Sequence, residues 1–281
     1  MIYNALYTLS EINIYPIKSL GGISLESSDV EERGLKYDRR WVLVNEGNKF
    51  FTQREYPEMA LIKVIIKNDG LKLQHKRKNV ETLTVPFDFA HSKKDKVVIW
   101  NDTVIGEFYN KLIDDWFFEI LGIKCHLVKM PESTKRFVDK NYTKNKIVSF
   151  ADGYPFLIIG QSSLEDLNSR LADPLPMNRF RPNLVFTGGK PYEEDNWKNI
   201  KIGEVKFQAV KPSVRCVITT TNQETAERSH EPLFTLTKYR KTKNGVTFGM
   251  NLVCESTGQV NLGDVIEPIR TNFLNSFRRK L

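Results

Sequence analysis

Hydrophobic residues along this 281-residue chain occur mostly in short runs, the pattern expected of β-strands. In residues 205–209, Val205, Phe207 and Ala209 alternate with polar neighbours, which predicts a strand with one buried face. Further predicted strands are short and rich in β-branched or aromatic residues. They cover residues 42–44, 61–66, 96–100 and 184–186.

Two segments show helical periodicity instead. In residues 107–121 an apolar residue recurs at every fourth position, and Gly122 is placed to end the helix. In residues 163–171 leucines repeat at helical spacing, and Ser162 with Glu165 forms a predicted capping box. The sequence therefore predicts many strands and few helices.

A polar, basic stretch at residues 131–146 separates two parts of the chain. It is typical either of a linker or of a loop that borders an active site. We place a domain boundary beside it, which divides the chain into residues 1–135 and 136–281.

Composition places the chain among globular proteins, with 40% hydrophobic and 27% charged residues. Its apolar runs are far shorter than the roughly 20 residues of a membrane helix, and its amino terminus lacks the features of a secretory signal. We therefore expect a cytoplasmic protein that does not enter a membrane.

The net charge of +8 arises from basic residues spread along the chain. A solvated surface explains such a distribution, and so does an anionic ligand or an acidic partner. A nucleic-acid-binding β-barrel is a third alternative. No aromatic-rich binding strand is visible, so we do not expect a nucleic acid polymer as partner.

Common catalytic signatures are missing from the sequence. It contains no phosphate-binding GxxxxGK[ST], no GxGxxG after a strand, no HExxH and no GxSxG. Its histidines are scattered, and Cys125, Cys216 and Cys254 are too few and too far apart for a disulfide framework or a zinc site. These observations narrow the range of chemistry to be considered.

In four segments, polar residues lie beside predicted strands or turns although the structure has no obvious need for them there. The segments are YPIKS at 15–19, YDRRW at 37–41, NRFRPN at 178–183 and SVRCVITTT at 213–221. With DGYPFLI at 152–158, EDNW at 194–197 and Phe248-Gly249, they resemble the MOSC superfamily in the same chain order. The resemblance is to the group that holds the mitochondrial amidoxime-reducing component and YcbX-like proteins, and it covers about Leu9 to Pro268.

The resemblance implies an α+β fold that is predominantly β. A β-rich amino-terminal domain would precede a β-barrel with peripheral helices. The family binds a molybdenum cofactor, a molybdopterin that carries the metal. The cleft between the two domains is the expected place for it.

Cys216 follows an apolar run and a predicted turn at Lys211-Pro212, and Arg215 beside it favours the thiolate. Taken alone, a free cysteine is more often a small buried hydrophobe. The resemblance implies instead that Cys216 is the catalytic residue and the protein ligand of molybdenum. Val214 stands where relatives often carry serine.

The resemblance also implies which residues bind the cofactor. Lys18, Ser19 and Arg39 match the residues that bind its phosphate, to which they would offer a point charge, a hydroxyl and a planar fork of donors. Without the resemblance, Lys18 and Arg39 would be taken for members of surface ion pairs. The remaining predicted cofactor-binding residues are Arg181, Asn183, Arg215, Thr219 and Thr220.

The implied activity is the reduction of N-hydroxylated substrates such as amidoximes, hydroxylamines and N-hydroxylated bases. The alternative is a module that carries sulfur as a persulfide on Cys216 or binds the cofactor without catalysis. With Cys216 assigned to molybdenum, too few cysteines remain for an iron–sulfur cluster. We therefore expect electrons from a separate protein, a ferredoxin, flavodoxin or cytochrome.

Overall fold

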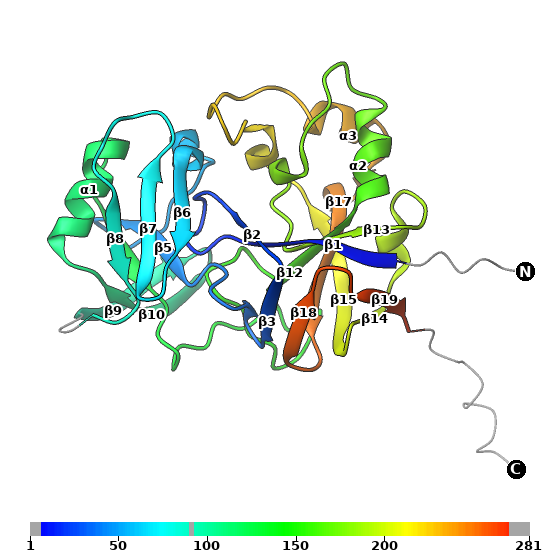
Figure 1. Ribbon diagram of the computed structural model, residues 1–281, viewed down its shortest axis with the longest axis horizontal. Coiled ribbons are helices and arrows are strands. Elements are labelled where there is room, and N and C mark those ends of the chain that lie inside the picture. Colours follow the sequence, from blue (N-terminus) through cyan, green and yellow to red (C-terminus); the bar gives the residue numbers. More distant parts are fainter. Residues whose placement is uncertain (1–6, 90–92, 270–281) are drawn as a thin grey trace, which may run out of the picture.

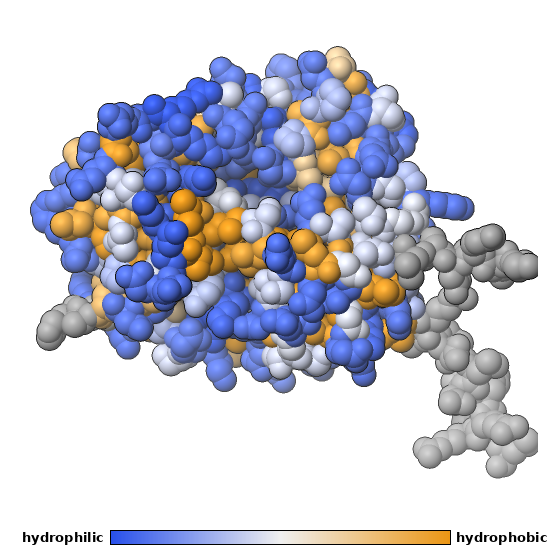
Figure 2. Space-filling view, viewed as in Figure 1, coloured by the Kyte–Doolittle hydropathy of each residue, from blue (hydrophilic) through white to orange (hydrophobic). Residues whose placement is uncertain are grey.

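The computed structural model describes residues 7–89 and 93–269 of the chain. These residues form two bodies that lie side by side (Figure 1): a β-rich body with helix α1, and a barrel with helices α2 and α3 at one end. In the space-filling view, hydrophobic residues form a band across the middle of the face shown, and hydrophilic residues cover most of the rest (Figure 2).

The barrel consists of seven strands in the order β12-β13-β1-β19-β14-β15-β17, and pairing between β17 and β12 closes it. Its strands are β1 (Tyr7–Ile14), β12 (Phe156–Gly160), β13 (Leu184–Thr187), β14 (Asn199–Ile202), β15 (Val205–Val214), β17 (Gly245–Cys254) and β19 (Val265–Pro268). Only β12 and β13 pair in parallel among neighbours of this barrel. Two short strands extend the sheet: β2 (Ile23–Leu25) pairs with β1, and β16 (Lys241–Thr242) pairs with β17.

The other body contains a four-stranded sheet in the order β5-β11-β10-β9 and a three-stranded sheet in the order β6-β7-β8. Their strands are β5 (Trp41–Asn45), β6 (Ile62–Ile66), β7 (Gly70–His75), β8 (Leu83–Pro86), β9 (Lys93–Ile99), β10 (Asp102–Phe108) and β11 (Cys125–Lys129). A third sheet, β18-β3-β4, joins early and late parts of the chain; its strands are β3 (Ser27–Glu31), β4 (Gly34–Leu35) and β18 (Gly258–Asn261).

Large apolar side chains fill each body. Phe156, Phe207 and Leu252 are buried in the barrel, and Trp41 and Phe117 are buried in the other body. Each body therefore has its own hydrophobic core.

The predicted strands are all present, with small differences at their ends. Val205 and Phe207 of β15 point into the barrel core, which confirms the alternation in the sequence. Leu61 lies in a 3-10 turn before β6, and Trp100 lies in the tight turn between β9 and β10. Both residues were predicted to belong to strands.

Helix α1 (Lys111–Leu121) begins four residues later than predicted. Phe108 completes strand β10, and the Asn110 side chain caps the helix by accepting a hydrogen bond from the Ile113 amide. The predicted end is confirmed: Gly122 adopts a left-handed conformation with φ of 70° and its amide donates to the Phe118 carbonyl.

Helix α2 (Gln161–Asn168) begins and ends earlier than predicted, and the capping box at Ser162 and Glu165 does not form. The Glu194 carboxylate takes that role, because it accepts hydrogen bonds from the Gly160 amide at 3.2 Å and from the Ser163 hydroxyl at 2.9 Å. Helix α3 (Leu233–Tyr239) packs against β17 and was not predicted.

The predicted fold class is confirmed: the chain is α+β, predominantly β, with a barrel and peripheral helices. The division into residues 1–135 and 136–281 stays a prediction. Strand β1 crosses it, because β1 pairs with β13 and β19, and the two ends at 1–6 and 270–281 lie outside the described residues.

In the described part of the chain, every helix is too short or too polar to cross a membrane. The cytoplasmic location stays a prediction.

Candidate functional site

Cys216 lies where β15 leaves the barrel. The register of β15 against β17 shifts twice, between Ala209 and Lys211 and between Pro212 and Val214, so Lys211-Pro212 forms part of a bulged strand rather than the predicted turn. Bulges of this kind redirect side chains beside binding sites. The strand is followed by a 3-10 turn, Val217–Thr220. Cys216 is the residue directly before this turn, and it is half-buried.

A cavity of about 300 Å³ opens beside Cys216, between the two bodies. Apart from Thr220, every predicted site residue lines it; these are Lys18, Ser19, Arg39, Arg181, Asn183, Arg215, Cys216 and Thr219. Thr220 is buried outside the cavity lining, and its hydroxyl donates to the Val217 carbonyl. The structure therefore brings together segments from both parts of the chain.

Lys18 is a buried cation rather than a member of a surface ion pair. Its side chain is 5% exposed, and its ammonium donates to the Phe150 carbonyl at 2.8 Å and to the Asp152 carboxylate. Burial lowers the pKa of Lys18 from its usual 10.5 to about 8, although Asp152 opposes this effect. Lys18 and Arg54 together hold the pKa of Asp152 well below its usual range.

Arg39 and Arg181 lie against the same aromatic ring. The guanidinium of Arg39 is 4.3 Å from the Tyr15 ring centroid, and that of Arg181 is 4.1 Å from it. Arg39 also pairs with the fully buried Asp38 at 2.7 Å and donates to the Asn183 amide oxygen at 3.0 Å. Because Tyr15 and Asp38 hold both guanidinium groups, the arginines are positioned without a ligand.

Buried donors at this site have no partner within the protein. Among the described residues, Nη2 of Arg181 and Nε of Arg215 are buried without a hydrogen bond. Burial lowers the pKa of each of these arginines to about 10, so both remain charged at neutral pH. A buried, charged donor without a partner is costly, and an anion in the cavity would satisfy it.

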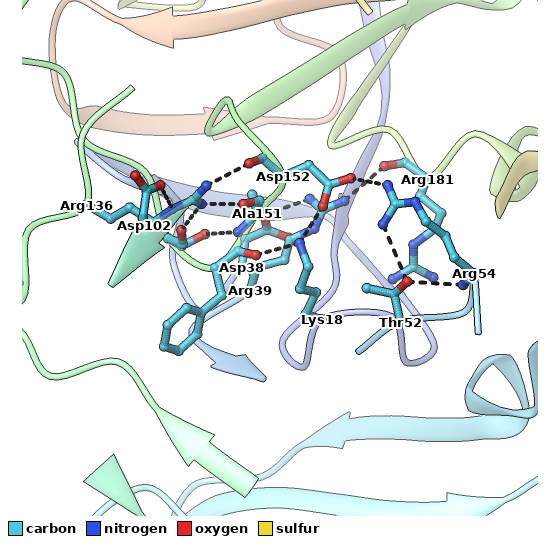
Figure 3. A network of polar contacts seen from close by, with 12 residues as sticks. Lys18, Asp38, Arg39, Thr52, Arg54, Asp102, Arg136, Ala151, Asp152 and Arg181 are labelled. Atoms are coloured by element: carbon cyan, nitrogen blue, oxygen red, sulfur yellow. Dashed lines mark hydrogen bonds and ion pairs between the residues drawn. The ribbon is translucent and has the colours of Figure 1, made fainter. Parts of the chain in front are cut away.

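Arg54 is a basic residue of the cavity that the sequence analysis did not predict. Its Nη2 is 2.9 Å from the Asp152 carboxylate (Figure 3), and its side chain lines the same cavity as Cys216. The attraction of Asp152 and Cys216 raises the pKa of Arg54, although burial acts in the opposite direction. The thiol therefore lies beside two guanidinium groups, those of Arg54 and Arg215.

The charges that line the cavity are strongly unbalanced. The lining contains one carboxylate, from Asp152, and six basic side chains. The six are Lys18, Arg39, Arg54, Arg181, Lys211 and Arg215. Such a cavity favours an anion with several negative oxygens.

The backbone at three lining residues is in the left-handed region, which non-glycine residues rarely adopt. The φ angles are 69° at Ser19, 48° at Arg39 and 54° at Arg181. Strained backbone of this kind is concentrated at functional sites, where the surrounding structure imposes it.

Tyr15, Asp38 and Asp152 were within the segments that the sequence singled out, but no role was predicted for them. Arg54 lies in a stretch with no distinguishing pattern. Within residues 7–89 and 93–269, no three His, Cys, Asp or Glu side chains gather as ligands for a metal ion. Cys216 is therefore a single thiol in a basic cavity.

Two family models match the sequence. The model described as MOSC domain matches residues 145–267, and the model described as MOSC N-terminal beta barrel domain matches residues 6–124. The two matches together include every predicted site residue and Arg54.

Named relatives match most of the chain. A mitochondrial amidoxime reducing component 2 from Rattus norvegicus is 31% identical over 92% of this chain and 82% of the relative. A molybdenum cofactor sulfurase from Oryza sativa is 32% identical over 87% of this chain. The chain spans only about a third of that sulfurase, 32% of its length.

Among solved structures, the YUAD protein from Bacillus subtilis aligns with 94% of this chain and 96% of its own length, at 10% identity and a TM-score of 0.40.

Proposed function

We infer, from the premise that the chain belongs to the MOSC-domain family, that its cavity holds a molybdenum cofactor and that the protein reduces N-hydroxylated substrates. The observation that carries this proposal is the set of buried, unpartnered guanidinium atoms beside a half-buried thiol. Together these features suit a ligand that combines a phosphate with a soft metal.

The residues present fit the phosphate of such a cofactor. Lys18 would supply a compact charge, Ser19 a hydroxyl, and Arg39 a planar pair of donors. Arg181 reaches the same cavity with an unpaired nitrogen. Because Tyr15, Asp38 and Asn183 already hold the guanidinium groups, binding an anion would require little rearrangement.

Cys216 would hold the metal through its sulfur, in a cavity that the guanidinium groups of Arg54 and Arg215 also line. When bound, the cofactor supplies two-electron chemistry that removes an oxygen atom from the substrate. The chain itself binds and orients the cofactor, and Thr219 stiffens the Cys216 turn by donating from its hydroxyl to the Cys216 carbonyl at 2.9 Å. Electrons would come from a separate protein such as a ferredoxin, flavodoxin or cytochrome.

The alternative is a module in which Cys216 carries sulfur as a persulfide. It is favoured by the similarity to proteins named molybdenum cofactor sulfurase, of which the chain spans about a third. The same half-buried thiol beside two guanidinium groups would serve this chemistry. Turnover separates the two, since only the reductase converts an amidoxime to an amidine when a reduced donor protein is added.

Replacement of single cysteines tests the metal assignment. Cys216→Ser is expected to lose at least about nine-tenths of the bound molybdenum and all reductase activity, because a hydroxyl is a poor substitute for a soft thiolate. Cys125 and Cys254 are buried outside the cavity lining, and burial raises the pKa of both thiols. Cys125→Ser and Cys254→Ser are therefore matched controls that should retain molybdenum. The measurement is metal analysis of protein from a host that makes the cofactor, and normal molybdenum content in Cys216→Ser would refute the assignment.

A further inference from the structure

A second, wider hollow of about 430 Å³ adjoins the cavity of Cys216. The two share Asp152, Gly153, Tyr154 and Lys211 in their lining, so they lie next to each other. The cavity of Cys216 is basic. The outer hollow is lined by the aromatic residues Trp100, Phe137 and Tyr154 and by charged residues of both signs.

Two of these aromatic residues are unusually exposed. Trp100 is 43% exposed and Phe137 is 58% exposed. Phe137 belongs to the polar stretch at residues 131–146, which the sequence left open as a linker or an active-site loop. Because Phe137 lines the hollow, its position favours the interpretation of residues 131–146 as a loop that borders the site.

Trp100 is held in place at an energetic cost. It is in the two-residue turn between β9 and β10, because Ile99 pairs with Asp102, and its φ is 56°. Positive φ in such a turn favours glycine or asparagine, and a large aromatic side chain there is strained. One side of its ring packs against Phe50, with the ring centroids 5.0 Å apart, and 43% of the residue remains exposed. An aromatic surface is therefore held in place at the border of the hollow.

The turn that carries Trp100 is tied to the inner cavity from two sides. The Arg54 guanidinium lies 4.8 Å from the Trp100 ring and also pairs with Asp152 beside Cys216. On the other side, Asp102 pairs at 2.7 Å with Arg136, whose guanidinium donates to the Asp152 carbonyl at 2.8 Å (Figure 3). The aromatic border therefore has a fixed position relative to Cys216.

We propose that the outer hollow is a substrate subsite, in which Trp100 and Phe137 bind the planar aromatic body of an N-hydroxylated substrate while its N–O group enters the cavity of Cys216. This inference rests on the proposed function for the choice of substrate. It adds a preference for aromatic over small aliphatic substrates. Contact with aromatic rings provides that preference, because a methyl group offers much less area and no ring face.

Equilibrium binding of benzamidoxime and acetamidoxime tests the subsite without requiring turnover. Trp100→Asn removes the ring, and asparagine tolerates the left-handed backbone. We expect the Kd for benzamidoxime to rise by about three- to tenfold, the range of a lost aromatic contact, and the Kd for acetamidoxime to change by less than about twofold. Phe137→Ala should act in the same direction.

Phe234→Ala is the matched control. Phe234 is 59% exposed and has the Lys238 ammonium 4.2 Å from its ring, but it lies on α3 outside both cavity linings. It should leave both Kd values unchanged. A single cooperative melting transition in each of the three variants shows that the fold is intact.

Two results would overturn the subsite: an unchanged Kd for benzamidoxime in both Trp100→Asn and Phe137→Ala, or equal binding of the two ligands by the unaltered protein. Reduction of both ligands by cofactor-loaded protein is measured separately. Discrimination in binding without any reduction would leave the subsite standing and would reject the proposed reductase.

Discussion

Lys18 shows how one buried side chain links stability to binding. The ammonium is almost fully buried, and its ion pair with Asp152 does not offset the cost of burial, so its pKa falls to about 8. At about 1.4 kcal/mol per pKa unit, keeping this charge at neutral pH costs on the order of 3 kcal/mol. Under the proposed function, binding of the cofactor phosphate would offset this cost.

The pH dependence of anion binding follows from this pKa. Lys18 loses its charge as pH rises through about 8, so the Kd for sulfate should be constant near pH 6.5 and rise above pH 8 by up to about tenfold per pH unit. Sulfate itself does not titrate in this range. Isothermal titration between pH 6.5 and 9.5 provides the measurement.

Two variants identify the residue responsible. Lys18→Met should bind sulfate weakly at every pH and lose the step near pH 8. Lys211→Met removes another cation from the same lining and should keep that step. Persistence of the step in Lys18→Met would show that a different group titrates.

At the scale of elements, the sequence pattern correctly predicted helix α2 but predicted the wrong residues for its cap. Ser162 and Glu165 have the spacing of a capping box, but the Ser162 hydroxyl is buried without a partner. Glu194, which is fully buried, instead binds the Gly160 amide and the Ser163 hydroxyl. Burial raises the pKa of Glu194, against the effect of these donors.

Substitutions at these residues should separate the two caps. Glu194→Ala removes hydrogen bonds at the start of α2 and should lower the free energy of unfolding by about 1–2 kcal/mol. Ser162→Ala removes a hydroxyl that has no partner and should change it by less than about 0.5 kcal/mol. Urea denaturation monitored by circular dichroism gives both values, and a larger loss in Ser162→Ala than in Glu194→Ala would restore the predicted capping box.

Across the whole molecule, the two bodies meet around a basic cavity in a chain with a net charge of +8. An acidic donor protein would be attracted to such a chain, and this attraction weakens as salt screens it. The proposed reductase would therefore depend on ionic strength only in the step that involves another protein.

Amidoxime reduction across a salt series tests that expectation. With an acidic ferredoxin or flavodoxin as donor, kcat/KM should fall by about tenfold or more between 50 and 500 mM salt. With dithionite in its place, it should change by less than about threefold. Equal salt dependence with both donors, or efficient turnover from a pyridine nucleotide with no added protein, would contradict a charge-steered protein donor.

The sequence alone determined the features that depend on near neighbours along the chain. The alternation at Val205 and Phe207 predicted a strand because side chains in a strand point to opposite faces in turn. Gly122 predicted the end of α1 because a left-handed residue stops a helix. The motif segments contain all the predicted site residues that line the cavity, because each segment carries its own polar residues.

The tertiary structure decided the features that depend on contacts between distant segments. Arg54 reaches Asp152 across 98 residues of sequence, and Glu194 caps a helix that begins more than 30 residues before it. The sequence predicted Trp100 as the end of a strand, but Ile99 pairs with Asp102, so Trp100 lies in the turn between two strands. Such contacts leave no local pattern, because the chain brings those residues together only when the barrel closes and the two bodies pack against each other.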